Sequence, residues 1–98
     1  AAVAKNYRFN ALVGVDTMFI NGKPYLNAVD WGTSFQLVVP MDDTTSRSAW
    51  RAFRRGWLRH LAFAGFLVTD GGKEFEGAFS EALEARSIGQ FVTDGNSL

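Results

Sequence analysis

The chain contains no cysteine, one histidine and two prolines among its 98 residues. Without thiols it has no disulfide framework, no cysteine nucleophile and no cysteine-bound zinc or iron–sulfur centre. The single histidine, His60, excludes most histidine-based metal sites and would have to serve alone in any serine–histidine mechanism. So little proline argues against a disordered or collagen-like chain. These absences remove several classes of enzyme and leave a chain that should fold.

A long apolar run is absent as well. No stretch reaches the roughly 18 consecutive apolar residues that a transmembrane helix needs. Residues 1–10 include Lys5 and Arg8 where a signal peptide would be apolar. We therefore expect a soluble, intracellular chain without a membrane partner, and its length allows a single domain. Neither a P-loop nor a dinucleotide-binding glycine motif is present, so no nucleotide cofactor is expected.

Charges of both signs are present in equal numbers but are unevenly distributed. Ten acids balance ten lysines and arginines. Residues 44–69 contain five arginines and no acid, whereas residues 70–98 contain six acids and two basic residues. The net charge of zero therefore conceals a basic segment followed by an acidic one.

The first part of the chain has the pattern of an antiparallel meander. Residues 12–20, 25–30 and 34–40 are short runs rich in β-branched and apolar residues. Asn21-Gly22 separates the first two runs, and Asn-Gly is a strong hairpin signal because a type I′ turn needs two residues with positive φ. The pattern predicts three strands joined by turns.

A basic amphipathic helix should follow this meander. Residues 42–45 supply capping side chains, and over residues 46 to about 63 apolar residues recur every three or four positions. Gly56 costs about 1 kcal/mol relative to alanine inside a helix, so it predicts a close packing contact. Gly65 should end the segment. The aromatic residues of the helix are expected in the core, with a dimer contact as the alternative: Trp50, Phe53 and Trp57.

The second half of the chain alternates strand and helix. Residues 66–69 form an uncharged apolar run directly after the helix, which is typical of a buried strand parallel to an earlier one. Residues 75–86 show helical spacing, and residues 90–93 are predicted to form a last strand. The order βββαβαβ predicts an α/β domain with a mixed sheet, in which an antiparallel three-strand meander is followed by parallel strands with flanking helices.

Two acids occupy unusual places in this pattern. Asp16 lies within an apolar strand, and Asp70 stands at the carboxyl end of the predicted parallel strand, before Gly71-Gly72. Carboxylates that converge from adjacent strands repel each other unless a cation lies between them, and Mg²⁺ prefers oxygen ligands. The alternative is that Asp16 faces solvent and Asp70 caps the following helix. Asp30 is interpreted as a turn acid that bonds its own backbone, and His60 as a structural residue near a helix end.

The arginines of the predicted helix are candidates for phosphate binding. Arg47, Arg51, Arg55 and Arg59 drift by only about 40° per step around an ideal helix. The alternative is an ordinary solvated face, since no aromatic residue lies on the same face of the helix to stack bases.

Several motifs together resemble the catalytic core of retroviral and retrotransposon integrases. Residues 67–75, Leu-Val-Thr-Asp-Gly-Gly-Lys-Glu-Phe, resemble the family's apolar strand followed by Asp-x-Gly-x-Glu-Phe. Residues 9–16 resemble its first strand with the first catalytic Asp, and residues 25–40 resemble its second and third strands. The likeness covers about residues 9–93 and implies an RNase H-like fold.

This resemblance implies a function as well as a fold. Residues 1–98 would be a single partial integrase catalytic core domain, a polynucleotidyl transferase that acts on DNA phosphodiesters in DNA integration by a two-metal mechanism. Asp16 and Asp70 would be catalytic and would bind Mg²⁺ or Mn²⁺. The domain could form a homodimer, and its location would be the cytoplasm and nucleus. DNA contacts would come from Arg47, Arg51, Arg55, Arg59 and Lys73. Two alternatives are a non-catalytic RNase H-like module that binds nucleic acid or protein, and an RNase H-type nuclease.

Two departures from the family pattern bear on activity. Gly71 stands where the family usually has Asn after its second acid. The family's third metal ligand is a Glu on a helix after the last strand, and that position would fall beyond Leu98. Glu74 and Glu76 precede that region and do not replace it. We therefore expect a C-terminally truncated core with weak or no strand transfer of its own.

Overall fold

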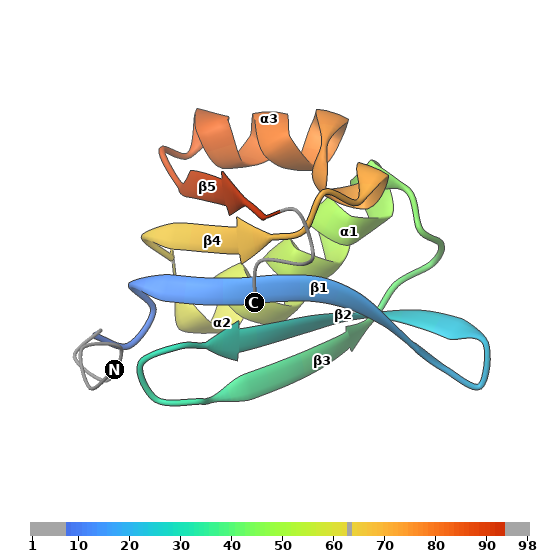
Figure 1. The fold of residues 1–98 in the computed structure, drawn as a ribbon, viewed down its shortest axis with the longest axis horizontal. Helices are drawn as coiled ribbons and strands as arrows, with labels where there is room; N and C mark the ends of the chain where they lie inside the picture. Colours follow the sequence, from blue (N-terminus) through green and yellow to red (C-terminus); the bar gives the residue numbers. More distant parts are fainter. Residues whose placement is uncertain (1–7, 63, 94–98) are drawn as a thin grey trace.

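The computed structural model describes residues 8–62 and 64–93. These residues form one five-stranded sheet and a set of helices (Figure 1). The elements in chain order are β1 (Leu12–Ile20), β2 (Lys23–Asp30), β3 (Gln36–Pro40), α1 (Ser46–Phe53), a π-helical turn η2 (Arg54–Leu58), α2 (Arg59–Leu61), β4 (Phe66–Thr69), a 3₁₀ turn η3 (Lys73–Phe75), α3 (Gly77–Ala85) and β5 (Gly89–Val92). No helix in the described part of the chain has the length and apolarity to span a bilayer.

The sheet has the mixed topology that the sequence predicts. Its strand order is β3-β2-β1-β4-β5. The first three strands pair antiparallel, whereas β4 runs parallel to both β1 and β5. The α/β class and the order βββαβαβ are therefore confirmed.

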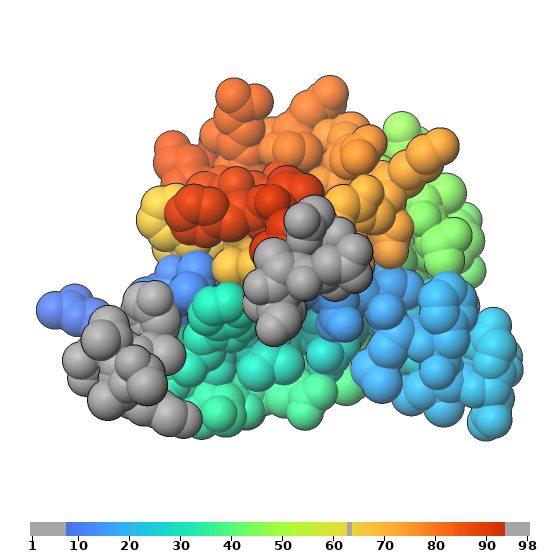
Figure 2. Space-filling model, in the orientation of Figure 1, coloured from blue at the N-terminus to red at the C-terminus, as the bar shows by residue number. Residues whose placement is uncertain are grey.

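The β1–β2 hairpin forms as expected, and β3 begins later than expected. Asn21 and Gly22 have φ values of 53° and 77°, as a type I′ turn requires. The hairpin extends beyond the body of the molecule (Figure 2). β3 was expected from residue 34, but Ser34 has a φ of 68° and donates its N–H to the carbonyl of Asp30 at 2.7 Å. This turn delays the strand to Gln36.

The basic helix is continuous from Ser46 to Leu61 but contains a π-helical turn in its middle. Thr45 caps its start by accepting the Ser48 N–H at 3.2 Å. The helix ends earlier than predicted because Ala62 adopts a φ of 68°, and residue 63 lies outside the described residues. A Cβ added to Gly56 would overlap the side chain of Val39 in β3, which confirms the expected close contact.

The last two elements differ slightly from their predicted bounds. The helix predicted over residues 75–86 is α3, which covers Gly77–Ala85, because Glu76 is extended and Phe75 belongs to η3. β5 covers Gly89–Val92 instead of residues 90–93, although Thr93 still donates its N–H to the Thr69 carbonyl at 2.8 Å.

The core lies between the helices and one face of the sheet. Phe53 and Trp57 are fully buried with rings nearly parallel at 6.5 Å, while Trp50 is half-buried beside them. In Figure 1, α1 and α2 pass behind the sheet. Strand alternation buries Val13 and Val15 on this side of β1. No helix of the described residues covers the opposite side, which we call the open face.

Candidate carboxylate site

Asp16 lies on the open face because successive side chains of β1 point to opposite faces of the sheet. Its neighbour Val15 points into the core, so the Asp16 side chain is exposed on the other side. Asn27 in β2 donates its amide N–H to Asp16 Oδ1 at 3.1 Å, and Gln36 in β3 donates to Asn27 Oδ1 at 2.5 Å. This polar row across three strands fixes one oxygen of the carboxylate.

Asp70 reaches the same place from the neighbouring strand. β1 and β4 are parallel and pair Val15 with Thr69, so Asp16 and Asp70 each come one residue later at the same level. Asp70 is exposed, and its Oδ1 accepts the Gly72 N–H at 2.9 Å. Asp70 therefore orders the turn after β4, but it does not cap a helix as the alternative interpretation expected, because Gly72 precedes η3 and α3 begins only at Gly77.

The two acids line one hollow of about 330 Å³ on the open face. Asn27 and Trp31 also line it. A Cβ on Gly14 would come within 2.7 Å of the Trp31 indole nitrogen, so glycine at this point of β1 lets the indole lie against the strand. Sequence reasoning missed Trp31, and a glycine inside an apolar strand was the available signal.

Asp30 holds the turn that presents Trp31. Its fully buried carboxylate accepts the Asn10 N–H at 2.7 Å, the Thr33 N–H at 2.8 Å and the Thr33 hydroxyl at 2.7 Å. The Trp31 N–H donates to the Leu12 carbonyl at 3.0 Å. The interpretation of Asp30 as a turn acid is confirmed, and Asp30 does not line the hollow.

A third acid does not join the pair within the described residues. Glu74 Oε2 accepts the Thr17 hydroxyl at 2.6 Å. A Cβ on Gly72 would come within 2.7 Å of Glu74 Oε1 and 3.0 Å of Asp70 Oδ1, so Gly72 lies between these two carboxylates. Residues 8–62 and 64–93 contain no group of three His, Cys, Asp or Glu residues that could hold a metal ion. The described donor set is therefore Asp16 and Asp70.

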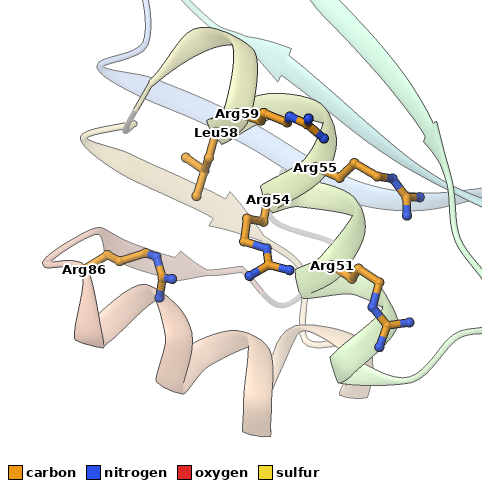
Figure 3. Close-up of a pocket in the computed structure, with 6 residues that line it drawn as sticks. All are labelled: Arg51, Arg54, Arg55, Leu58, Arg59 and Arg86. Atoms are coloured by element: carbon orange, nitrogen blue, oxygen red, sulfur yellow. The ribbon is translucent and has the colours of Figure 1, made fainter.

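The predicted phosphate-binding residues are only partly brought together. Three of the four predicted helical arginines line a second hollow, of about 570 Å³, on the helix side of the sheet (Figure 3). Arg47 is exposed but is not part of its lining, and Lys73 lies in η3. Two arginines that the sequence reasoning left out, Arg54 and Arg86, complete the lining together with Arg51, Arg55, Leu58 and Arg59.

His60 is exposed near the end of α2 and lines neither hollow.

Comparison with solved structures identifies the architecture. The catalytic core domain of BIV integrase matches with a TM-score of 0.77 and 13% sequence identity. The chain has the fold of an integrase catalytic core. The match covers 90% of this chain and 57% of the integrase chain, and at this identity it establishes the fold alone. No family model and no curated protein sequence matches the chain.

Proposed function

We propose that this integrase-like domain is a metal-dependent polynucleotidyl transferase that acts on DNA phosphodiesters. The observation that supports the proposal is the position of Asp16 and Asp70, side by side on parallel strands β1 and β4 and lining one hollow. Two acids from neighbouring strands repel each other, and a divalent cation between them relieves that repulsion.

The donor set fits Mg²⁺ or Mn²⁺. Mg²⁺ is usually bound by one or two carboxylates together with substrate phosphates and water, so a two-acid site suits it when a phosphodiester supplies further oxygens. In both acids the hydrogen bond from a described residue goes to Oδ1. The Oδ2 atoms have no partner among the described residues and are available as ligands.

The side chains around the pair have positioning roles in this proposal. Asn27 keeps Asp16 in place, and the Gly72 N–H does the same for Asp70. The bound metal would polarise the phosphodiester and favour deprotonation of an attacking water or 3′-hydroxyl. Because the hollow opens on a sheet face that no described helix covers, a polymer such as DNA can approach it.

The homodimer implied by the resemblance remains a prediction, which sedimentation of the chain would test.

A non-catalytic binding module is the second candidate. It is favoured by one observation: the described residues bring together two acids and no third. Such a module would bind DNA or a protein without needing a divalent metal.

Binding of a short DNA duplex, followed by fluorescence anisotropy with and without Mg²⁺, tests the proposal. We expect Mg²⁺ to tighten binding in the wild type and to have no effect in Asp16→Asn or Asp70→Asn. Glu84→Gln is the matched control, because Glu84 is also exposed but lies on α3, away from the hollow. DNA binding that is equally strong with and without Mg²⁺ in the wild type and all three variants would support the binding module. The same titration with an RNA–DNA hybrid tests the remaining alternative. If Mg²⁺ tightens binding of the hybrid and not of the DNA duplex, the result would indicate an RNase H-type nuclease.

A further inference from the structure

The hollow on the helix side is lined almost entirely by arginine. It has a volume of about 570 Å³ and is bounded by α1, η2, α2 and the end of α3. In Figure 3, Arg54 and Arg86 extend into the gap between the two helical segments, from opposite sides. The lining residues are Arg51, Arg54, Arg55, Leu58, Arg59 and Arg86.

The positive charge of this hollow is mostly uncompensated. Within the described residues, only Arg51 pairs with an acid, Asp42, at 3.0 Å. Arg55 donates to the Pro40 carbonyl at 3.2 Å, and Arg86 donates to the Ala82 carbonyl at 3.3 Å. Arginine stays protonated at every physiological pH, so these guanidinium groups repel one another unless an anion lies between them.

The π-helical turn helps to build the hollow. At its end the Arg59 N–H donates to the Arg54 carbonyl, five residues back, so this turn is wider than an α-helical one. Its inner side is anchored, because Trp57 is fully buried and donates its indole N–H to Asn10 Oδ1 at 2.8 Å. Gly56 packs against Val39 of β3. A π-helical turn is rare and frequently marks a functional site.

The opposite wall of the hollow, formed by Arg86 at the end of α3, is held in place by a different contact. The Arg86 guanidinium carbon lies 4.7 Å from the centre of the Trp50 ring, in a cation–π contact. Trp50 in turn packs against Phe53 and Phe79 of the core, with ring centres 6.3 and 6.1 Å away. The guanidinium groups of both walls are therefore carried on elements that are fixed by core aromatic residues.

From this geometry we propose that the hollow binds a compact polyanion, a small molecule that carries at least two neighbouring phosphate groups. Its volume falls in the range of small-ligand pockets, about 300–1,000 Å³. Arginine matches phosphate geometry because its planar guanidinium donates two parallel hydrogen bonds. Leu58 adds an apolar wall.

A compact ligand fits better than extended nucleic acid. The helix advances only about 12 Å between Arg51 and Arg59, which leaves room for a few phosphates. The neighbouring helix α3 carries exposed Glu81 and Glu84, whose carboxylates would repel a phosphate backbone that extends along this helix. The site is also separate from Asp16 and Asp70, which lie on the opposite face of the sheet.

Calorimetric titration of the whole chain with tripolyphosphate, at physiological ionic strength and without divalent metal, tests the proposal. We expect one binding site, with orthophosphate binding at least about tenfold more weakly because it contacts fewer arginines. Arg54→Ala and Arg86→Ala should each weaken tripolyphosphate binding about tenfold or more. Arg47→Ala is the matched control, since Arg47 is an exposed arginine of the same helix outside the hollow, and it should bind like the wild type. Arg54→Lys keeps the positive charge but loses the planar guanidinium with its paired donors. Its affinity for tripolyphosphate should lie between those of the wild type and Arg54→Ala.

Four outcomes would overturn the proposal. The first is the absence of tripolyphosphate binding, and the second is binding that is equally strong in Arg54→Ala and Arg86→Ala. The third is a DNA duplex that binds through these arginines while tripolyphosphate fails to displace it, which would assign the hollow to nucleic acid. The fourth is a dimer in sedimentation that Arg54→Ala dissociates while tripolyphosphate does not bind. Circular dichroism of each variant verifies that it is folded.

Discussion

The two hollows of this domain lie on opposite sides of one sheet and carry opposite charge. The carboxylate hollow is built on the open face by neighbouring strands, and its acids are exposed. The arginine hollow is built by helices whose other sides form the core. The difference indicates that the arginine hollow depends on core packing, whereas the acids of the carboxylate hollow can be changed with little loss of stability.

Removal of a core aromatic residue should produce the largest difference between the two sides. Trp57→Ala is expected to lower the free energy of unfolding by about 3–5 kcal/mol, because it leaves a cavity in the core and removes the hydrogen bond from the indole N–H to Asn10 Oδ1. Asp16→Asn should change that free energy by less than about 0.5 kcal/mol, because Asp16 is exposed. Urea unfolding measures both. Equal losses would mean that the acids are as deeply involved in stability as the core.

A smaller effect is expected for Gly56, the glycine within the π-helical turn. Gly56→Ala should destabilise the protein by about 1–2 kcal/mol, because the added methyl group overlaps Val39 and this outweighs the better helix propensity of alanine. Gly71→Ala is the control, since the nearest atom to an added Cβ there is the Thr93 carbonyl oxygen, 3.9 Å away. Urea unfolding of both variants tests the expectation, and a more stable Gly56→Ala protein would refute the close contact.

On the open face, substitution of Asn27, whose side-chain amide bonds Asp16, should weaken metal binding and leave stability unchanged. Asn27→Ala removes the hydrogen bond that orients Asp16, and loss of such an orienting group typically weakens metal binding about tenfold. Calorimetric titration with Mn²⁺ measures this change, with Glu84→Gln as the control, because Glu84 is exposed on α3 and does not line the hollow. Unchanged Mn²⁺ affinity in Asn27→Ala would show that Asp16 needs no such support.

The smallest expected effect lies at the start of the basic helix. Hydrogen bonds from the Ser48 side chain, and then from Thr45, lower the pKa of Asp43 from 3.8 to about 2. Because this pKa is lower in the folded chain, its contribution to stability is present above pH 3.8 and is lost as the pH falls towards about 2. Urea unfolding across this range should show a weaker pH dependence in Asp43→Asn than in the wild type. An identical pH dependence in both proteins would show that the Asp43 carboxylate does not contribute to stability in this range.

Local patterns were sufficient to predict most of the fold. A short run of β-branched and apolar residues located β1, and Asn21-Gly22 located the hairpin, because both signals act over a few residues. The start of β3 was missed because the turn at Ser34 is stabilised by hydrogen bonds around the buried Asp30. That arrangement depends on residues such as Asn10, which are distant in the sequence.

The candidate site was predictable to a similar degree. Asp16 stood out as an acid within an apolar strand, and Asp70 as an acid at the carboxyl end of a strand, before two glycines. The strand register then places them together. The arginine hollow was only partly predicted, because an ideal helix gives no sign of a π-helical turn, and Arg86 belongs to another helix. Trp31 was missed because its place depends on a tertiary contact with Gly14.

Paramagnetic broadening by Mn²⁺ tests the central claim, that Asp16 and Asp70 together form a divalent-metal site. In spectra of the isotope-labelled chain, we expect substoichiometric Mn²⁺ to broaden the signals of Asp16, Asp70 and their neighbours first. The Glu81 and Glu84 signals on α3 should stay sharp, and both Asp16→Asn and Asp70→Asn should remove the effect. Broadening that is equal at all exposed acids, or that persists in the two variants, would contradict the account.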